Sequence, residues 1–434
     1  MKINFKIICL ILALVITCQV TAKQNVILMI SDGQGYNTLN AANIYLGRNI
    51  LEQFGFDIKI SMQTHSASNP AGDYNAVKMW SDIKWAGTTP TDSAAAASAM
   101  YTGKKHYNNA INQIDGQNTT SIFDIASERG YATGAITTVE FSHATPAACG
   151  AHNVSRENYS DIANEMIFKS GLDVIIGAGH PFHNDNGSSR STPDYNYVGG
   201  QTTWEQLKAG KANKFTIIES KADFERLADG TLSPDKVIGV IQAATTTQQA
   251  RPAGAAFNNN VPSLATMSLG ALNVLNKNEN GFCIMIEGGA VDWANHANQK
   301  DRMIEEEIDF LSAVKAVNEW VEHHSSWNET LLIVSADHEC GFLTGDVNSL
   351  CDIVNSGTGS IPKMAFNSHK HTNSLVPLFA KGKNAEMFNH YIIGCDNIGS
   401  DAYFGINSRS YVDNTTIFTV MNCTVAELAS EYKK

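Results

Sequence analysis

The sequence predicts an α/β protein with a large, mostly parallel sheet that helices cover on both faces. Its recurring unit is a short apolar run that ends in polar residues and is followed by a helical stretch. This unit occurs at 26–30, 133–138, 173–177, 237–241, 282–286 and 331–334. Continuous apolar strands alternating with helices indicate a parallel sheet buried on both sides. Ligands bind such sheets beyond the carboxyl ends of the strands, so the polar residues there should meet along one edge.

Length and composition favour one large domain that does not bind nucleic acid. The chain has 434 residues, of which 43% are hydrophobic, which is enough for an extensive core. It holds 31 Lys and Arg against 43 Asp and Glu, a formal net charge of −12. Nucleic-acid binding requires a basic surface, so this balance argues against such a partner.

Residues 1–22 have the pattern of a signal peptide, which leaves a single mature domain at 23–434. Lys2 and Lys6 precede an apolar run at 7–20, and Val20-Thr21-Ala22 offers a small-residue cleavage site. The run is too short to predict a membrane span. A lipoprotein anchor at Cys18 is the less favoured alternative, because no small residue precedes that cysteine. The expected location is secreted or periplasmic.

Two segments have weaker strand and helix patterns than the rest. Residues 181–256 are rich in Gly, Ser, Asn and Thr and are interpreted as a variable insertion over the rim of the sheet, with helices near 203–209 and 221–228. Residues 340–369 are a shorter second insertion. Cys283 lies inside an apolar strand and is expected to be a small buried hydrophobe. Any disulfide pairing stays open among Cys340, Cys351, Cys395 and Cys423.

Ser93 begins an alanine-rich helix, with Thr91 or Asp92 available as its N-cap. A serine in the first turn places its hydroxyl where backbone amides and the helix dipole favour an anion. No histidine is obviously paired with it, so activation as a nucleophile would require a metal ion. The alternative is a plain capping serine.

The segment around Asp292 and His296 offers a metal site on a helix. The two residues are four apart and therefore face the same side, which suits zinc. Glu287, at the end of the preceding strand, offers an oxygen ligand suited to magnesium. A solvated helix face is the alternative for the isolated pair.

Further candidate ligands follow other strands. Asp337 and His338 are adjacent just past the strand at 331–334, and Asp32 follows the strand at 26–30. His369 or His371 could complete a nitrogen-rich site. One carboxylate at a strand end is commonly only a cap or turn former, but three together with several histidines exceed that role.

The segment 143–156 could bind a phosphate group. Arg156 could hold two phosphate oxygens in a bidentate fork, and Thr145 offers a hydroxyl to a magnesium-type ion. His143 stands at the start of the segment. Taken alone, Arg156 could equally be a surface ion-pair partner.

These segments together resemble the alkaline phosphatase family. The resemblance covers most of the mature chain and rests on five segments in the family's order: Ser31-Asp32-Gly33, Asp92-Ser93-Ala94, 143–156, 287–296, and Asp337-His338 with His371. It implies a three-layer α/β/α sandwich, a homodimer, two zinc ions and one magnesium ion. The implied activity is hydrolysis of small phosphate monoesters with broad specificity, through a phosphoserine intermediate.

The resemblance also assigns roles to residues. It gives Asp292, His296 and His371 to the first zinc, Asp32, Asp337 and His338 to the second, and Asp32, Thr145 and Glu287 to the third ion. Ser93 would be the nucleophile, Arg156 the phosphate anchor and Asp92 a structural residue at the helix start.

Two residues depart from the best-known bacterial branch, which has Asp where this chain has His143 and Lys where it has Trp293. The pattern resembles phosphatases described from marine and cold-water bacteria, and it leaves the third ion open between magnesium and zinc. Alternatives are a phosphodiesterase with Thr91 as nucleophile and a non-catalytic metal- or phosphate-binding protein. A sulfatase would need a C/S-x-P-x-R motif, which the sequence lacks.

Overall fold

A computed structural model describes residues 23–69, 71–405 and 408–430, so the predicted signal peptide at 1–22 lies outside the described residues. Its central sheet has eleven strands in the order β16-β17-β2-β15-β10-β1-β9-β5-β6-β8-β7. In that order the strands are Gly394–Cys395, Ser410–Asp413, Ile58–Gln63, Val376–Gly382, Thr330–Ser335, Gln24–Ser31, Gly281–Gly288, Ala132–Glu140, Val174–Ala178, Val237–Val240 and Thr216–Ile218.

Fourteen α-helices accompany this sheet in the described part of the chain. From α1 to α14 they are Tyr36–Leu46, Ala76–Ser81, Ile83–Ala86, Ser93–Thr102, Ile122–Glu128, Ala144–Ala147, Tyr159–Phe168, Gln201–Lys208, Lys221–Ala228, Leu264–Leu275, Ala290–His296, Lys300–His324, Asp401–Phe404 and Thr415–Ser430. The 3₁₀ helices η1, η2 and η3 are Leu51–Phe54, Asn196–Val198 and Ala385–Tyr391. Three two-stranded ladders pair β3 (Gln113–Ile114) with β4 (Gln117–Asn118), β11 (Glu339–Cys340) with β14 (His371–Thr372), and β12 (Leu343–Thr344) with β13 (Ala365–Phe366).

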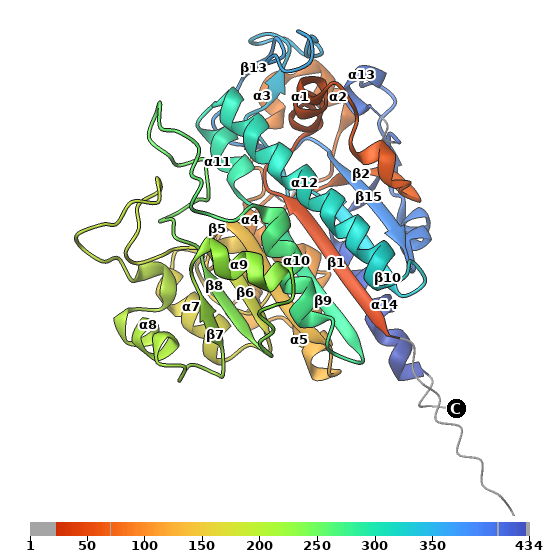
Figure 1. Ribbon diagram of the computed structural model, residues 1–434. Coiled ribbons are helices and arrows are strands. Elements are labelled where there is room, and N and C mark those ends of the chain that lie inside the picture. Colours follow the sequence, from red (N-terminus) through yellow and green to blue (C-terminus); the bar gives the residue numbers. More distant parts are fainter. Residues whose placement is uncertain (1–22, 70, 406–407, 431–434) are drawn as a thin grey trace, which may run out of the picture.

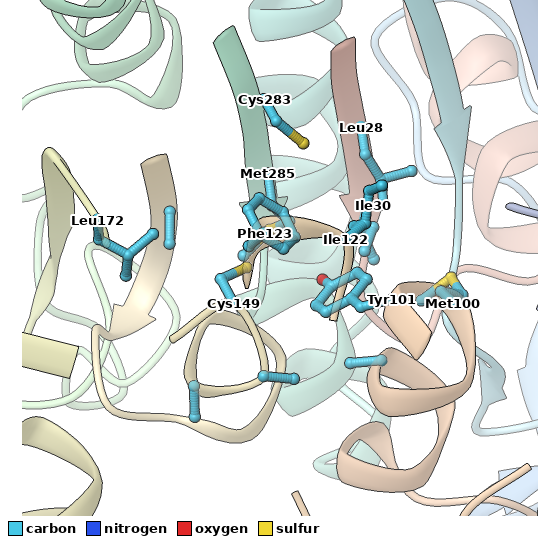
Figure 2. Close-up of a cluster of buried hydrophobic side chains, with 14 of the residues drawn as sticks. Leu28, Ile30, Met100, Tyr101, Ile122, Phe123, Cys149, Leu172, Cys283 and Met285 are labelled. Carbon is cyan, nitrogen blue, oxygen red and sulfur yellow. The ribbon is translucent and has the colours of Figure 1, made fainter. Parts of the chain in front are cut away.

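Strand β1 shows why the sheet needs helices on both faces. All eight of its residues are buried, as its continuous apolar run predicts. Val26, Leu28 and Ile30 pack in one hydrophobic cluster with α4, α5 and α14, whereas Ile27 and Met29 pack in another with α10 and α12. Figure 1 shows α10 and α12 lying across one face, and Figure 2 shows part of the first cluster. The predicted α/β/α sandwich is confirmed.

The sheet is parallel from β10 through β1, β9, β5, β6 and β8 to β7. β15 runs antiparallel to both β10 and β2, so the prediction of a mostly parallel sheet is correct. Ile30 of β1 pairs with Glu287 of β9 on one side and with Ser335 of β10 on the other. The residues that follow these three strands therefore emerge together at one edge.

The segment 181–256 contributes helices and strands to the fold as well as loops. It supplies α8, α9, the edge strand β7 and its neighbour β8, and its Gln249 lines the cavity described below. Its role as a cover over the rim, like the domain boundaries, stays a prediction. The segment 340–369 contains β12 and β13.

The six cysteines of the described residues are all free, including those whose pairing the sequence left open. Cys283 is fully buried within the first hydrophobic cluster, as expected. No helix in the described ranges combines the length and apolar character needed to cross a membrane.

Candidate active site

The Ser93 hydroxyl lies at the start of α4. The alanines after it favour a helix, and the carboxylate of Asp92 caps that helix by accepting the amide of Ala95 at 2.9 Å. Of the two caps that the sequence offered, the structure uses Asp92. Ser93 is 1% exposed, and its Oγ lies 3.2 Å from Nε2 of His338. An anion at this position would face the amides of the first turn, where the helix dipole favours negative charge.

A first metal-ligating group contains Asp292 and His296 of α11 and His371 of β14. The Nε2 atoms of His296 and His371 are 2.9 Å apart, and Asp292 carboxylate oxygens lie 3.2 Å and 3.4 Å from them, respectively. The Nδ1 atom of His296 donates to the carbonyl of His369, and that of His371 to the carbonyl of Thr91. These bonds leave both Nε2 lone pairs available to one ion, as in zinc sites.

A second group contains Asp32, Asp337 and His338, all fully buried. Nε2 of His338 lies 3.1 Å from Asp337 Oδ2 and 3.5 Å from Asp32 Oδ1. Asp337 Oδ1 accepts the backbone amides of Gly33 at 3.1 Å and of His338 at 2.9 Å. Those bonds fix the carboxylate and leave Oδ2 facing the other two side chains.

A third group contains Asp32, His143 and Glu287, whose potential ligand atoms lie within 4.8 Å of one another. Glu287 is the penultimate residue of β9 and accepts a hydrogen bond from the Thr137 hydroxyl of β5. Thr145, in the first turn of α6, is also fully buried. Asp32 belongs to two groups, so it could bridge two ions.

Buried carboxylates without partners make these groups suitable for cations. Among the described residues, the oxygens without a hydrogen-bond partner include both of Asp32 and one each of Thr145, Glu287, Asp292 and Asp337. Burial raises the pKa of Glu287 to about 8 and, with repulsion from Asp292, that of Asp337 to about 6. Burial and then Asp337 raise the pKa of Asp32 well above its usual range. Divalent cations would satisfy these oxygens and remove the repulsion.

Asp292 differs from its neighbours. Its burial alone would raise its pKa, but attraction from His371 and hydrogen bonds with His296 lower the pKa well below its usual range. The carboxylate is therefore ionised at neutral pH and available to a metal ion.

Arg156 is oriented by two neighbours. Its Nη1 lies 3.2 Å from Asp92 Oδ2, and its Nη2 donates to Nε2 of His143 at 3.0 Å. Burial and the charge of Arg156 lower the pKa of His143 to about 3, so His143 is neutral. The ring of Trp293 lies edge-on to His143, with centroids 5.9 Å apart.

Part of this set lines one open cavity of about 720 Å³, whereas Asp32, Thr145, Glu287, Asp337 and His338 are not among its lining residues. The lining includes Ser93, His143, Arg156, Asp292, Trp293, His296 and His371, together with Asn108, Gln249 and Lys370. The structure thus brings the predicted site residues together. Four residues of the site were not predicted from the sequence: Asn108, Gln249 and Lys370 of the cavity, and Cys340, which joins the first metal-ligating group. Two of the four carried a signal, because Cys340 is close to Asp337 and His338 in sequence and Lys370 lies between His369 and His371.

The chain is similar to known proteins. The family model described as alkaline phosphatase matches residues 23–358. Alkaline phosphatase 4 of Bacillus subtilis is 33% identical over 341 residues, 75% of this chain and 63% of that protein. The alkaline phosphatase of Escherichia coli K12 is 28% identical over 414 residues, 83% of this chain and 82% of its own length.

Solved structures share the fold. The alkaline phosphatase of the Antarctic bacterium TAB5 is 25% identical, with a TM-score of 0.65, and the match covers 93% of this chain and 99% of that one. A cold-active alkaline phosphatase from a psychrophilic Shewanella has a TM-score of 0.67 at 23% identity, over 92% and 99% of the two chains. The matched region spans less than two thirds of the Bacillus relative. The family model nevertheless covers most of this sequence, and the chain belongs to the alkaline phosphatase family.

Proposed function

We propose that the protein hydrolyses a broad range of phosphate monoesters through a covalent phosphoserine intermediate at Ser93. The observation that carries the proposal is the single cavity that joins the Ser93 hydroxyl, the guanidinium of Arg156 and ligands of the first metal group. Family membership supports the same reaction class.

The first two metal-ligating groups, and the family resemblance for Thr145 at the third, indicate which residues would hold ions. Asp292, His296 and His371 would hold one zinc, Asp32, Asp337 and His338 a second, and Asp32, Thr145 and Glu287 a magnesium or zinc ion. Bound ions would lower the pKa of the attacking hydroxyl and stabilise the leaving alkoxide. A TAB5 alkaline phosphatase variant is described with magnesium in its M3 site, which supports a third ion here.

The chain's own groups position the phosphate. Ser93 Oγ would attack phosphorus in line, with the phosphate facing the first-turn amides of α4. Arg156, already oriented by Asp92 and His143, would donate to two equatorial oxygens. His143 and Trp293 would modulate how tightly phosphate binds. Asp92 would hold Arg156 in place relative to the start of α4.

The competing phosphodiesterase interpretation depends on Thr91. The Thr91 hydroxyl donates to the carbonyl of Asp92 at 3.0 Å, and the Thr91 carbonyl accepts from His371. The hydroxyl and the carbonyl of Thr91 are thus both engaged in hydrogen bonds within the protein. Arg156 would also occupy the space and charge of a second ester group. Both observations favour monoesters.

Arg156→Ala tests the substrate class. We expect monoester turnover to fall about 10²- to 10³-fold, the usual cost of one transition-state donor, and phosphate inhibition to weaken. Diester hydrolysis should change little, because a diester has one fewer charged oxygen for Arg156 to hold. Asp92 would still cap α4, so the fold should persist. The ratio of monoester to diester hydrolysis in both proteins is the measurement. Equal losses on both substrates would make Arg156 structural.

Trp293→Lys tests the effect of the tryptophan that stands where the best-known bacterial branch of the family has lysine. A lysine near bound phosphate adds on the order of 1 kcal/mol or more of Coulomb attraction, so phosphate inhibition should strengthen about 5- to 10-fold. Turnover should slow if phosphate release limits it. The double variant with His143→Asp should show the same direction.

Trp293→Leu is the matched control, because it removes the ring beside His143 without adding charge. Unchanged phosphate inhibition in Trp293→Lys and in the double variant would leave packing as the role of Trp293.

Further parts of the proposal come from the family resemblance and the N-terminal pattern. The protein would be exported by cleavage after residue 22, with Cys18 lipidation less favoured, and would act as a homodimer outside the cytoplasm. The mature chain, 23–434, would be one catalytic domain with variable segments at 181–256 and 340–369.

A further inference from the structure

Cys340 is a buried thiol inside a metal-ligating group. It is fully buried and free, and its Sγ lies within 4.8 Å of ligand atoms of Asp292, His296 and His371. The resemblance to alkaline phosphatases assigned only those three residues to the first zinc.

The fold places this thiol there through a short ladder. Cys340 of β11 pairs directly with His371 of β14, so their side chains project from the same face of the ladder. The amide of Cys340 donates to the carbonyl of Gly33 at 3.0 Å, and Asn295 donates to that same carbonyl. The backbone of Cys340 is therefore bonded to the loop after Asp32, and the Gly33 carbonyl links it indirectly to α11.

The surroundings distinguish Cys340 from an ordinary buried cysteine. Cys149 and Cys283 belong to the first hydrophobic cluster, whereas Cys340 belongs to none of the clusters formed by the described residues. Its neighbours in the group are a carboxylate and two imidazoles. Packing of a small hydrophobe does not account for a thiol at this position.

Asp292 supplies an independent sign that the group binds a cation. Its side chain is only 6% exposed, and its Oδ1 has no hydrogen-bond partner among the described residues. The Nε2 atoms of His296 and His371 are 2.9 Å apart, and Asp292 lies within 3.4 Å of both. Ligand atoms around a tetrahedral zinc are roughly 3.3–3.8 Å apart. Small adjustments would thus admit an ion.

We infer that Cys340 is a fourth ligand of the first metal ion, bound through its thiolate sulfur. The inference rests on the metal-dependent function proposed above. On ligation the S–H bond breaks, a sulfur–metal bond forms and the proton passes to water. Sulfur favours zinc, cobalt and cadmium over magnesium, so the first site should prefer borderline and soft divalent cations. Phosphate can still bind, because zinc accepts a fifth ligand.

Cobalt spectroscopy tests the sulfur ligand directly. The full-length protein, stripped of metal and reloaded with Co²⁺, should show a near-ultraviolet thiolate-to-cobalt charge-transfer band. Cys340→Ser should lose the band and bind Cd²⁺ more weakly relative to Mg²⁺. Cys283→Ala, which alters an equally buried cysteine in β9, should keep it.

The wild-type spectrum alone can overturn the inference, whatever the stability of the variants. A protein with cobalt bound at full stoichiometry and no such band has no sulfur ligand, and a band retained in Cys340→Ser would come from another thiol. Monoesterase activity of the cobalt protein in either case would leave the proposed function in place. Failure of Ser93→Ala to reduce turnover would overturn that function without affecting the band.

Discussion

Replacing Ser93 with alanine should lower monoester turnover on the order of 10⁵-fold, about 7 kcal/mol of transition-state stabilisation. Ser93 Oγ lies at the first turn of α4, 3.2 Å from His338 and within the cavity that Arg156 lines. Without this oxygen, the reaction must proceed by direct attack of water. The two-step route through a covalent intermediate is then lost.

The same substitution should abolish covalent labelling. Wild-type protein incubated with labelled inorganic phosphate at low pH should carry phosphate on the peptide that contains Ser93, and Ser93→Ala should carry none. The alanine variant should fold, because the capping bond of α4 belongs to Asp92.

Thr91→Val is the matched control, since it removes the neighbouring hydroxyl that a diesterase would use and should retain labelling. If Ser93→Ala still traps phosphate on this peptide, Thr91 becomes the nucleophile and the proposed mechanism fails.

The sequence predicted the parts of the site that depend on local pattern. Apolar runs defined β1, β9 and β10, and parallel strands carry the residues after them to one edge. The four-residue spacing of Asp292 and His296 placed them on one face of a helix, as α11 shows. These inferences required only the periodicities of strands and helices.

The parts that the sequence could not predict depend on contacts between distant segments. Cys340 joins the first group only because β11 pairs with β14 across a long loop, and short two-residue ladders leave no periodic pattern. Gln249 reaches the cavity from 181–256, where Gly and Thr obscure the pattern. The hydrogen bonds that fix the histidine tautomers run to backbone carbonyls, which sequence does not reveal.

Removing the metal ions should abolish activity and destabilise the fold. Each ion that binds only the folded state contributes about 4 kcal/mol when its concentration is a thousand times its dissociation constant. A chelated sample should therefore be inactive and have a lower Tm, and zinc plus magnesium should restore both. A chelator presaturated with zinc is the control. Full activity in a sample shown by elemental analysis to be metal-free would refute the proposed mechanism.

The stability lost on metal removal should depend on pH, and the buried carboxyl groups predict the direction of that dependence. In the metal-free protein, burial raises the pKa of Glu287 from 4.5 to about 8 and that of Asp337 from 3.8 to about 6. Between these values the folded state holds protons that the unfolded state has released, so the contribution of these two carboxyl groups to stability falls as pH rises from about 4 to 8. Metal-bound carboxylates are already ionised, and their affinity for metal grows as competing protons leave. The Tm difference between loaded and chelated protein should thus widen from about pH 5 to pH 8, and a constant difference would show that the ions do not bind these carboxylates.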